Sequence, residues 1–81
     1  MADDYPLLYG SIETAKRVGI SLRQLYYWVS VLRAVSPTRH RHGRRQFQYF
    51  TPRDLKILRD VKQRMARGYT LRAAVKASRL S

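Results

Sequence analysis

The side chains in this sequence that could do chemistry are mostly cationic. Lys and Arg number 17 against five Asp and Glu, so the formal net charge is +12 at pH 7. Thirteen of the 17 cations are Arg, whose planar guanidinium donates paired hydrogen bonds to phosphate oxygens and to guanine edges. A field of this strength opposes a compact chain, so we expect a polyanionic partner that neutralises it.

The densest cationic run is Arg-His-Arg-His-Gly-Arg-Arg at residues 39–45, which contains no apolar residue. Its charge and position supply four candidate phosphate contacts: Arg39, Arg41, Arg44 and Arg45. His40 and His42 are potential metal ligands, but a zinc site needs further ligands and none lies nearby in the sequence. We therefore favour contacts of this run with phosphate groups or with a nucleic-acid groove.

Catalytic and redox chemistry are not expected. The chain has no Cys, which excludes disulfides, thiolate metal sites and cysteine nucleophiles. The acids beyond the N-terminal tail are Glu13, Asp54 and Asp60. Asp54 fits a helix cap, and Asp60 has Lys56 and Arg64 four residues away on either side, which is the spacing of surface ion pairs on a helix. We predict neither an enzyme nor a bound metal or cofactor, because no two acids are placed to converge in a cleft.

The length of 81 residues allows one domain, and a hydrophobic content of 44% is too high for a disordered chain. We assign residues 8–81 to this domain and residues 1–7 to a flexible N-terminal tail. The acidic start is unlike a signal peptide, and no apolar run approaches the roughly 20 residues that span a bilayer. We expect a cytoplasmic protein that associates with the nucleoid.

Two helices joined by a short turn are predicted first. Apolar residues at helical spacing predict a helix over 11–18, with Ser11 as its N-cap and Gly19 as its stop. A second helix is predicted from its cap, Ser21, to about residue 32. A glycine-containing turn of three or four residues between two helices is the signature of a helix-turn-helix.

The second helix carries three aromatic residues in succession, and neighbours on a helix point about 100° apart. Trp28 lies on the side of Leu25 and Val29 and is expected in the core. Tyr27 points the opposite way, where it either lies flat over the neighbouring hairpin or places its hydroxyl on a phosphate. We favour the phosphate contact. Tyr26 is intermediate between the two sides.

A β-hairpin is predicted over about residues 35–50. Ser-Pro-Thr at 36–38 is typical of a turn, and Gln-Phe-Gln-Tyr at 46–49 alternates polar and aromatic side chains as a strand does. We expect the basic run to form the tip of this wing. The side chains expected to anchor the wing in the core are Phe47, Tyr49 and Phe50.

Two further helices are predicted after the wing. Thr51, Pro52 and Asp54 form a strong helix start, with a cap, a first residue and a capping-box acid. The apolar stripe of this helix consists of Leu55, Leu58, Val61 and Met65. Gly68 ends it, and Thr70 caps a fourth helix. The residues of the fourth helix expected to face inward are Leu71, Ala74, Val75 and Ser78.

Four stretches occur in the order of a known family. Residues 15–21 are similar to the pattern A-x-x-x-G-V-S, and residues 22–28 are similar to T-L-R-Y-Y-E or T-L-R-x-W-E. Residues 47–55 are similar to Y-R-L-Y-S-x-E-D-L, and residues 68–71 to G-F-S-L. The sequence therefore resembles the DNA-binding domain of the MerR family of bacterial transcription regulators, a winged-helix fold. The resemblance covers about residues 8–79.

The resemblance implies that the second helix enters the major groove and that the wing and Tyr27 contact the DNA backbone. Matched positions carry the DNA-contacting role over to Arg23, Gln24 and Tyr27. Tyr26 stands where the family has an Arg, and the loop at residues 31–37 lacks the Gly that is common in the family. The base preference of the family is therefore not transferable to this chain.

We predict a mainly α fold with a small β-hairpin, a winged helix-turn-helix that binds double-stranded DNA sequence-specifically as a transcription regulator. The recognition helix spans about residues 21–32 and the Arg-rich wing about residues 35–50. Lys16 and Arg17 precede the turn and are added as phosphate contacts. The candidate DNA-binding residues are Lys16, Arg17, Arg23, Gln24, Tyr26, Tyr27, Arg39, Arg41, Arg44 and Arg45.

Two alternatives stay open at this stage. A phage excisionase-like architectural protein shares the winged fold, and strong DNA bending would favour it. A protein-interaction module would use the third and fourth helices to bind an acidic partner, and binding that survives charge reversal in the second helix would favour it. The MerR family typically dimerises through a long helix after this domain, which the sequence lacks. We therefore expect a monomer when free. On DNA we expect either cooperative binding of neighbouring copies or, as the alternative, weak binding by a chain that is one module of a larger regulator.

Overall fold

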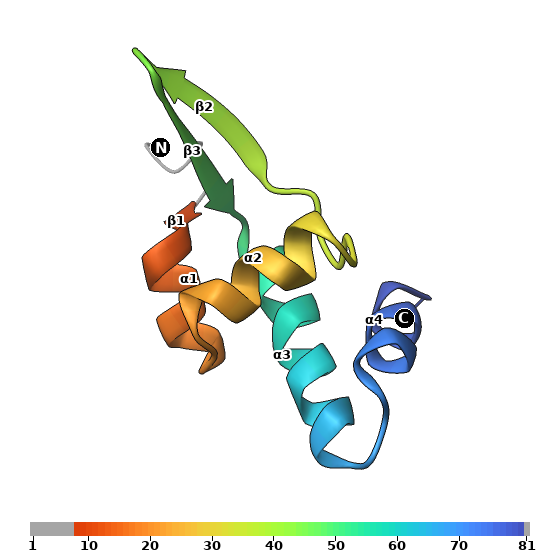
Figure 1. The fold of residues 1–81 in the computed structure, drawn as a ribbon. Coiled ribbons are helices and arrows are strands. Elements are labelled where there is room, and N and C mark those ends of the chain that lie inside the picture. Colours follow the sequence, from red (N-terminus) through yellow and green to blue (C-terminus); the bar gives the residue numbers. More distant parts are fainter. Residues whose placement is uncertain (1–7, 81) are drawn as a thin grey trace, which may run out of the picture.

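The structure, a computed structural model, describes residues 8–80, and the tail predicted over residues 1–7 lies outside the described residues. The elements in chain order are β1 (Tyr9–Gly10), α1 (Ser11–Val18), α2 (Leu22–Ser30), β2 (Thr38–His42), β3 (Arg45–Phe50), α3 (Pro52–Ala66) and α4 (Leu71–Leu80). Figure 1 shows the β2–β3 hairpin standing out from the helices, with α2 lying across the front of α3. The fold is the mainly α winged helix-turn-helix that the sequence predicts.

The helix α1 starts directly from the sheet. The prediction of Ser11 as its N-cap is wrong, because the cap position is Gly10 and Ser11 is the first helical residue. Gly10 is still extended and pairs with Tyr49, so β1 runs into α1 without a turn. At the other end, Gly19 has a left-handed φ of 85° and its N–H donates to the Ala15 carbonyl oxygen, 2.8 Å away. The predicted stop at Gly19 is therefore confirmed.

The helix α2 begins with a reciprocal cap. The Gln24 N–H donates to Ser21 Oγ at 3.0 Å, and the Ser21 N–H donates to Gln24 Oε1 at 2.9 Å. The helix ends at Ser30, short of the predicted end near residue 32. It ends early because the chain reverses at Arg33, whose φ is 53°. Leu32 therefore lies outside the helix, although it still packs against the core.

The sheet is antiparallel with strand order β1-β3-β2, so it contains one strand more than the predicted hairpin. Tyr9 pairs with Phe50, which ties β1 to the base of the wing. The expectation that the basic run forms only the tip is wrong. Its first residues form β2, which pairs with β3 along its whole length, and only Gly43 and Arg44 make the turn. An all-polar segment can form a strand here because the ladder consists of backbone hydrogen bonds.

Some residues predicted to lie in the core are buried, and others are exposed. Trp28 is buried as predicted, with 3% of its surface exposed, and Phe50 is fully buried. Phe47 does not anchor the wing, since 39% of its surface is exposed. It lies an odd number of residues from Phe50, so the two side chains leave the strand on opposite faces. Met65 is also exposed, in the last turn of α3, where the chain turns towards α4.

The helices α3 and α4 are joined by a polar contact. The Asp54 and Thr51 capping box that begins α3 is present as predicted, with hydrogen bonds of 3.0 and 3.1 Å. Asp60, which the sequence suggests as a member of a surface ion pair, also contacts α4. Its Oδ2 accepts a hydrogen bond from Arg64 Nε at 2.9 Å and another from Ser78 Oγ at 2.8 Å. Asp60 therefore fastens α4 to α3.

Candidate nucleic-acid interface

The outward side of α2 follows from its amphipathic sequence. The residues that α2 buries are Leu25, Trp28 and Val29. Tyr26 and Tyr27 expose 45% and 46% of their surface. Arg23, Tyr27 and Ser30 are all exposed and recur at positions i, i+4 and i+7, so they share one stripe of the helix. The structure therefore places the predicted residues Arg23, Tyr26 and Tyr27 on the solvent side of α2.

Gln24 has a structural task that the sequence prediction did not include. Its Oε1 accepts the Ser21 N–H at 2.9 Å, which holds the side chain against the first turn of α2. An amide that pairs with adenine uses both its oxygen and its NH₂ group. The Gln24 oxygen accepts the Ser21 N–H, and no hydrogen bond from its NH₂ group to another described residue is seen. Gln24 therefore stabilises the start of the helix and presents a donor beside Arg23.

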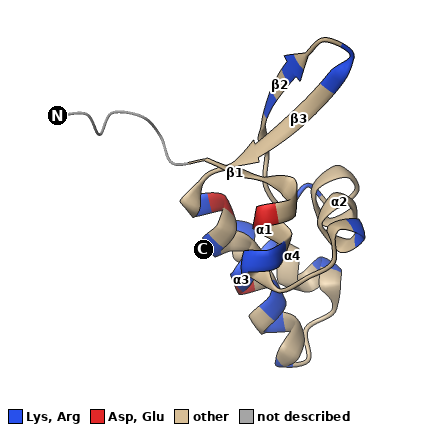
Figure 2. Cartoon of the chain, turned by 90° about the vertical axis from the view of Figure 1, so that its left-hand side faces the viewer, with Lys and Arg blue, Asp and Glu red and all other residues tan. Residues whose placement is uncertain are grey.

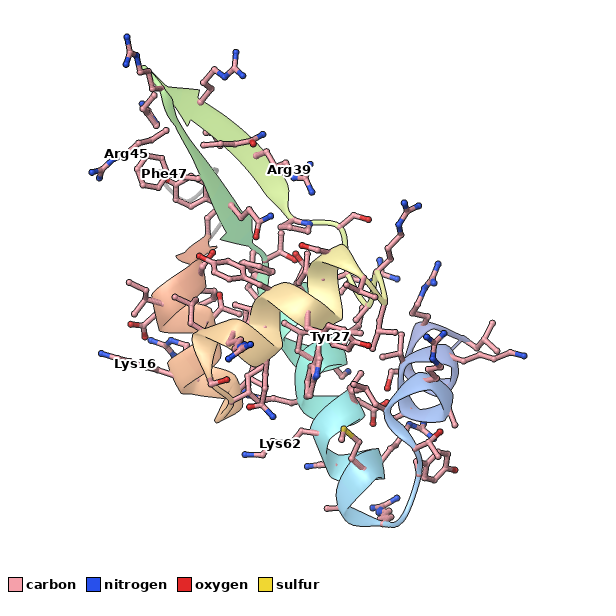
Figure 3. All side chains as sticks on the ribbon, viewed as in Figure 1. Lys16, Tyr27, Arg39, Arg45, Phe47 and Lys62 are labelled. Atoms are coloured by element: carbon pink, nitrogen blue, oxygen red, sulfur yellow. The ribbon has the colours of Figure 1, made fainter. Side chains whose placement is uncertain are left out.

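The two cations predicted at the end of α1 differ in their surroundings. Lys16 is exposed and its side chain extends away from the helices (Figure 3). Arg17 forms an ion pair with Glu13, with 2.7 Å between Nε and Oε2, and its guanidinium lies 4.7 Å above the centre of the Tyr9 ring. A phosphate contact by Arg17 therefore requires the loss or rearrangement of these two interactions, whereas one by Lys16 does not.

The four wing arginines do not form one cluster. Arg39 pairs with Gln48 and Arg41 pairs with Gln46, so both cations lie on one face of the hairpin. Arg45 lies on the other face, and Arg44 is in the turn. In Figure 3, Arg39 and Arg45 leave the hairpin on opposite sides. The wing therefore presents positive charge on both faces and at its tip.

The face of the wing that carries Arg45 is also aromatic. The ring of His40 meets that of half-buried Tyr49 edge-on at 5.4 Å between centres, and His42 meets Phe47 in the same way at 5.6 Å. These pairs give the two histidines a packing role across the strands. Within residues 8–80, no three His, Cys, Asp or Glu side chains are grouped to hold a metal ion.

Two cations of α3 that no sequence pattern singled out contact the helix-turn-helix. Lys62 Nζ donates to the Gly19 carbonyl oxygen at 2.8 Å, and Arg59 Nε donates to the Arg17 carbonyl oxygen at 3.4 Å. Both donors come from α3 and both acceptors lie at the end of α1. The only sequence signal was a pair of cations three residues apart on α3, which does not reveal a contact 42 or 43 residues away.

Residues 9–80 match the sequence model of the MerR helix-turn-helix regulatory proteins. The chain belongs to the MerR helix-turn-helix family. The match spans every element from β1 to α4. No curated protein gives a significant match to the sequence.

MerR-type helix-turn-helix proteins are DNA-binding regulators of transcription rather than enzymes, and membership of the family implies double-stranded DNA as the partner. The family is the one that the sequence motifs suggested, and its match covers α2 and the wing together. None of the helices within residues 8–80 has both the length and the apolar character to cross a membrane.

The distribution of charge in this MerR-family chain is uneven. Figure 2 shows Lys and Arg positions, in blue, on all the helices and near the tip of the wing, whereas the acidic positions, in red, lie on α1 and α3. Both ion pairs found within residues 8–80 also lie on α1 and α3, and they use Glu13 and Asp60. Hydrogen bonds from Arg64 and Ser78 hold the pKa of Asp60 below its ordinary value, so this acid stays charged next to its partners. Arg23, the single cation of α2, and the arginines of the wing have no acidic partner among the described residues.

Proposed function

We propose that this chain is a sequence-specific transcription regulator whose helix α2 enters the major groove of DNA while its wing lies along the flanking backbone. The observation that carries this proposal is that Arg23, Tyr26 and Tyr27 are exposed on α2, and that the wing which follows α2 carries four exposed arginines with no acidic partner within residues 8–80. Unpaired arginines on a helix and a hairpin suit a polyanion with grooves.

The proposed contacts divide into two kinds. Arg23 and the Gln24 NH₂ group, together with Tyr26, face the bases, because they lie on the exposed side of α2 near its start. Tyr27 and Lys16 face phosphates. The arginines proposed to bind the backbone from the wing are Arg39, Arg41, Arg44 and Arg45. Base contacts decide which sequence is bound, whereas phosphate contacts decide how tightly any duplex is bound.

Selection of bound sites from random duplex DNA at a stated salt concentration tests the proposal. We expect one preferred sequence, and we expect Arg23→Ala to change that preference at a cost of roughly 1–3 kcal/mol per lost base contact. Arg45→Ala serves as the matched control, since it should weaken binding to all sequences alike. If Arg45→Ala changes the preference and Arg23→Ala does not, α2 does not select the bases.

The salt dependence of binding gives a second measure. If about six to eight cations neutralise phosphates, log K against log salt falls with a slope near −5 to −7. A slope shallower than about −2 would show that the basic surface does not engage the backbone.

We also propose that the free chain is a monomer, because copies that each carry +12 repel one another in solution. DNA phosphates neutralise this charge, so neighbouring copies bind side by side on adjacent sites. Sedimentation without DNA tests the first statement, and a stable dimer there would refute it. Titration onto duplexes with one and with two sites tests the second, which fails if the two sites fill independently.

A further inference from the structure

The loop after α2 contains a strained residue. Arg33 has a φ of 53°, and within residues 8–80 it is the one residue other than Gly with a positive φ. The left-handed region favours Gly, because a Cβ crowds the backbone there. The reversal is needed to end the helix, since the Ala34 N–H returns to the Trp28 carbonyl oxygen at 3.0 Å. A Gly would serve this turn better, so the arginine side chain has no advantage for the fold.

Arg33 lines an open hollow at the base of the wing. The hollow has a volume of about 550 Å³, and it is lined by the polar residues Ser30, Arg33, Ser36 and Arg39 together with Val29, Val35 and Pro37. Neither arginine has an ion-pair partner among the described residues. Two guanidinium groups and two hydroxyls are donors, and together they suit a tetrahedral oxyanion such as a phosphate.

The hollow lies between the two elements proposed to bind DNA. Ser30 belongs to the exposed stripe of α2 that also carries Arg23 and Tyr27. Arg39 is at the start of β2, and Figure 3 shows it projecting on the side of the hairpin away from Arg45. A phosphate in this hollow would therefore sit where a DNA strand passes from the groove beside α2 to the backbone beside the wing.

We propose that Arg33, with Arg39 and the two serine hydroxyls, binds one phosphodiester group of the DNA backbone. This inference rests on the proposed function. The reversal of the chain holds Arg33 at this strained position, where it lines the hollow between Ser30 of α2 and Arg39 of β2. Strain that persists at a position where Gly is favoured is expected at binding sites.

The variant Arg33→Gly separates binding from folding. Because Gly relieves the left-handed backbone, the midpoint of thermal unfolding should stay unchanged or rise. Because one charged contact is lost, affinity for the preferred duplex should fall about tenfold, and the salt slope should become shallower by about 1. Arg53→Ala is the matched control. It removes one exposed arginine from the first turn of α3, outside the hollow, and should change affinity less than about twofold.

Replacing single phosphates of the DNA with an uncharged group locates the contact. Single methylphosphonate groups are placed in turn along the preferred duplex, and each duplex is titrated with the wild-type chain and with Arg33→Gly. At one position the substitution should weaken the wild type but not the variant, because the variant has already lost that contact. The proposal is overturned if no position shows this coupling, or if Arg33→Gly binds DNA as tightly as Arg53→Ala.

Two further outcomes are distinguishable. If the wild-type chain binds no duplex, the proposed function fails and this inference fails with it. If inorganic phosphate raises the unfolding midpoint of the wild type but not of Arg33→Gly, while both bind DNA equally, the hollow holds a free anion. That result overturns the assignment to the DNA backbone and leaves the proposed function intact.

Discussion

Lys62 on α3 donates a hydrogen bond from Nζ to the carbonyl oxygen of Gly19, 2.8 Å away, at the turn between α1 and α2. Carbonyl groups at the end of a helix have no N–H of their own helix to accept from, and they lie at the negative end of its dipole. A lysine therefore satisfies this carbonyl both as a donor and as a cation. The contact links α3 to the turn between α1 and α2.

Lys62→Met should lower the free energy of unfolding by about 1 kcal/mol, because it keeps most of the aliphatic stem and loses the donor. Denaturant titration measures the change. Lys56→Met is the matched control on the same helix, since Lys56 is exposed and no contact of it with the turn is seen. An equal effect of the two variants would show that the contact with Gly19 contributes nothing to stability.

Gly19→Ala should destabilise the chain by about 1–3 kcal/mol, because Gly19 has a φ of 85° that a Cβ strains. The added Cβ would also lie 2.5 Å from Lys62 Nζ, but the end of a lysine can move away, so the backbone dominates the cost. Thermal unfolding of Gly19→Ala in a Lys62→Met background separates the two causes. If the loss vanishes in that background, the steric contact, and not the backbone, is the cause.

Gln24 tests the division between capping and recognition. Gln24→Ala should cost about 0.5–1 kcal/mol of stability, because the Ser21 N–H loses its acceptor. Gln24→Glu keeps an acceptor at the same place and should leave stability unchanged, while it removes the NH₂ donor proposed to face the bases. We expect both variants to shift sequence preference in a site selection. Equal destabilisation by Ala and Glu would show that the capping box does not stabilise the helix.

Trp28→Ala should cost about 3–5 kcal/mol, because a large side chain with only 3% of its surface exposed leaves a cavity in a small core. Tyr26→Ala, on the exposed side of the same helix, should cost less than about 1 kcal/mol. Chemical unfolding of both variants measures the difference. A Trp28→Ala chain with an unchanged midpoint but no DNA binding would contradict the burial of Trp28.

Asp60 makes stability depend on pH in the acid range. Its pKa in the folded chain is lowered by the hydrogen bond from Arg64 and then by that from Ser78. A lowered folded pKa means that the stabilisation is complete above the ordinary pKa of an Asp and is lost as the pH falls through the folded pKa. Unfolding curves from pH 6 downward should therefore show a smaller acid loss in Asp60→Asn than in the wild type. Identical pH profiles would exclude a contribution from this carboxylate.

Ser78→Ala isolates the contact between the two helices. Ser78 is buried and its hydroxyl donates to Asp60 at 2.8 Å. We expect a loss of about 1 kcal/mol, because the carboxylate loses one donor and keeps the other. Ser30→Ala, which removes an exposed hydroxyl from α2, is the control and should leave stability within about 0.5 kcal/mol of the wild type. A Ser78→Ala chain as stable as this control would show that the hydrogen bond is not needed.

The local features of this fold are determined by short stretches of sequence. Ser21, Thr51 and Gly19 act within three or four residues, so caps and stops are visible without the rest of the chain. The burial of Trp28 also follows from the period of a single helix. The family motifs lie in the same stretches, which is why both the fold class and the family could be predicted.

The tertiary structure decided the features that depend on distant residues. Lys62 and Gly19 are 43 residues apart, and no local pattern brings a cation on α3 to the end of α1. The separation of Arg39 from Arg45 depends on the register between β2 and β3, because a shift of one residue would move a side chain to the other face. At Arg33, local sequence and tertiary structure both contribute. The sequence alone showed a loop without its usual Gly, and only the reversal of the chain beside the wing gave that Arg a left-handed backbone and a place in a hollow.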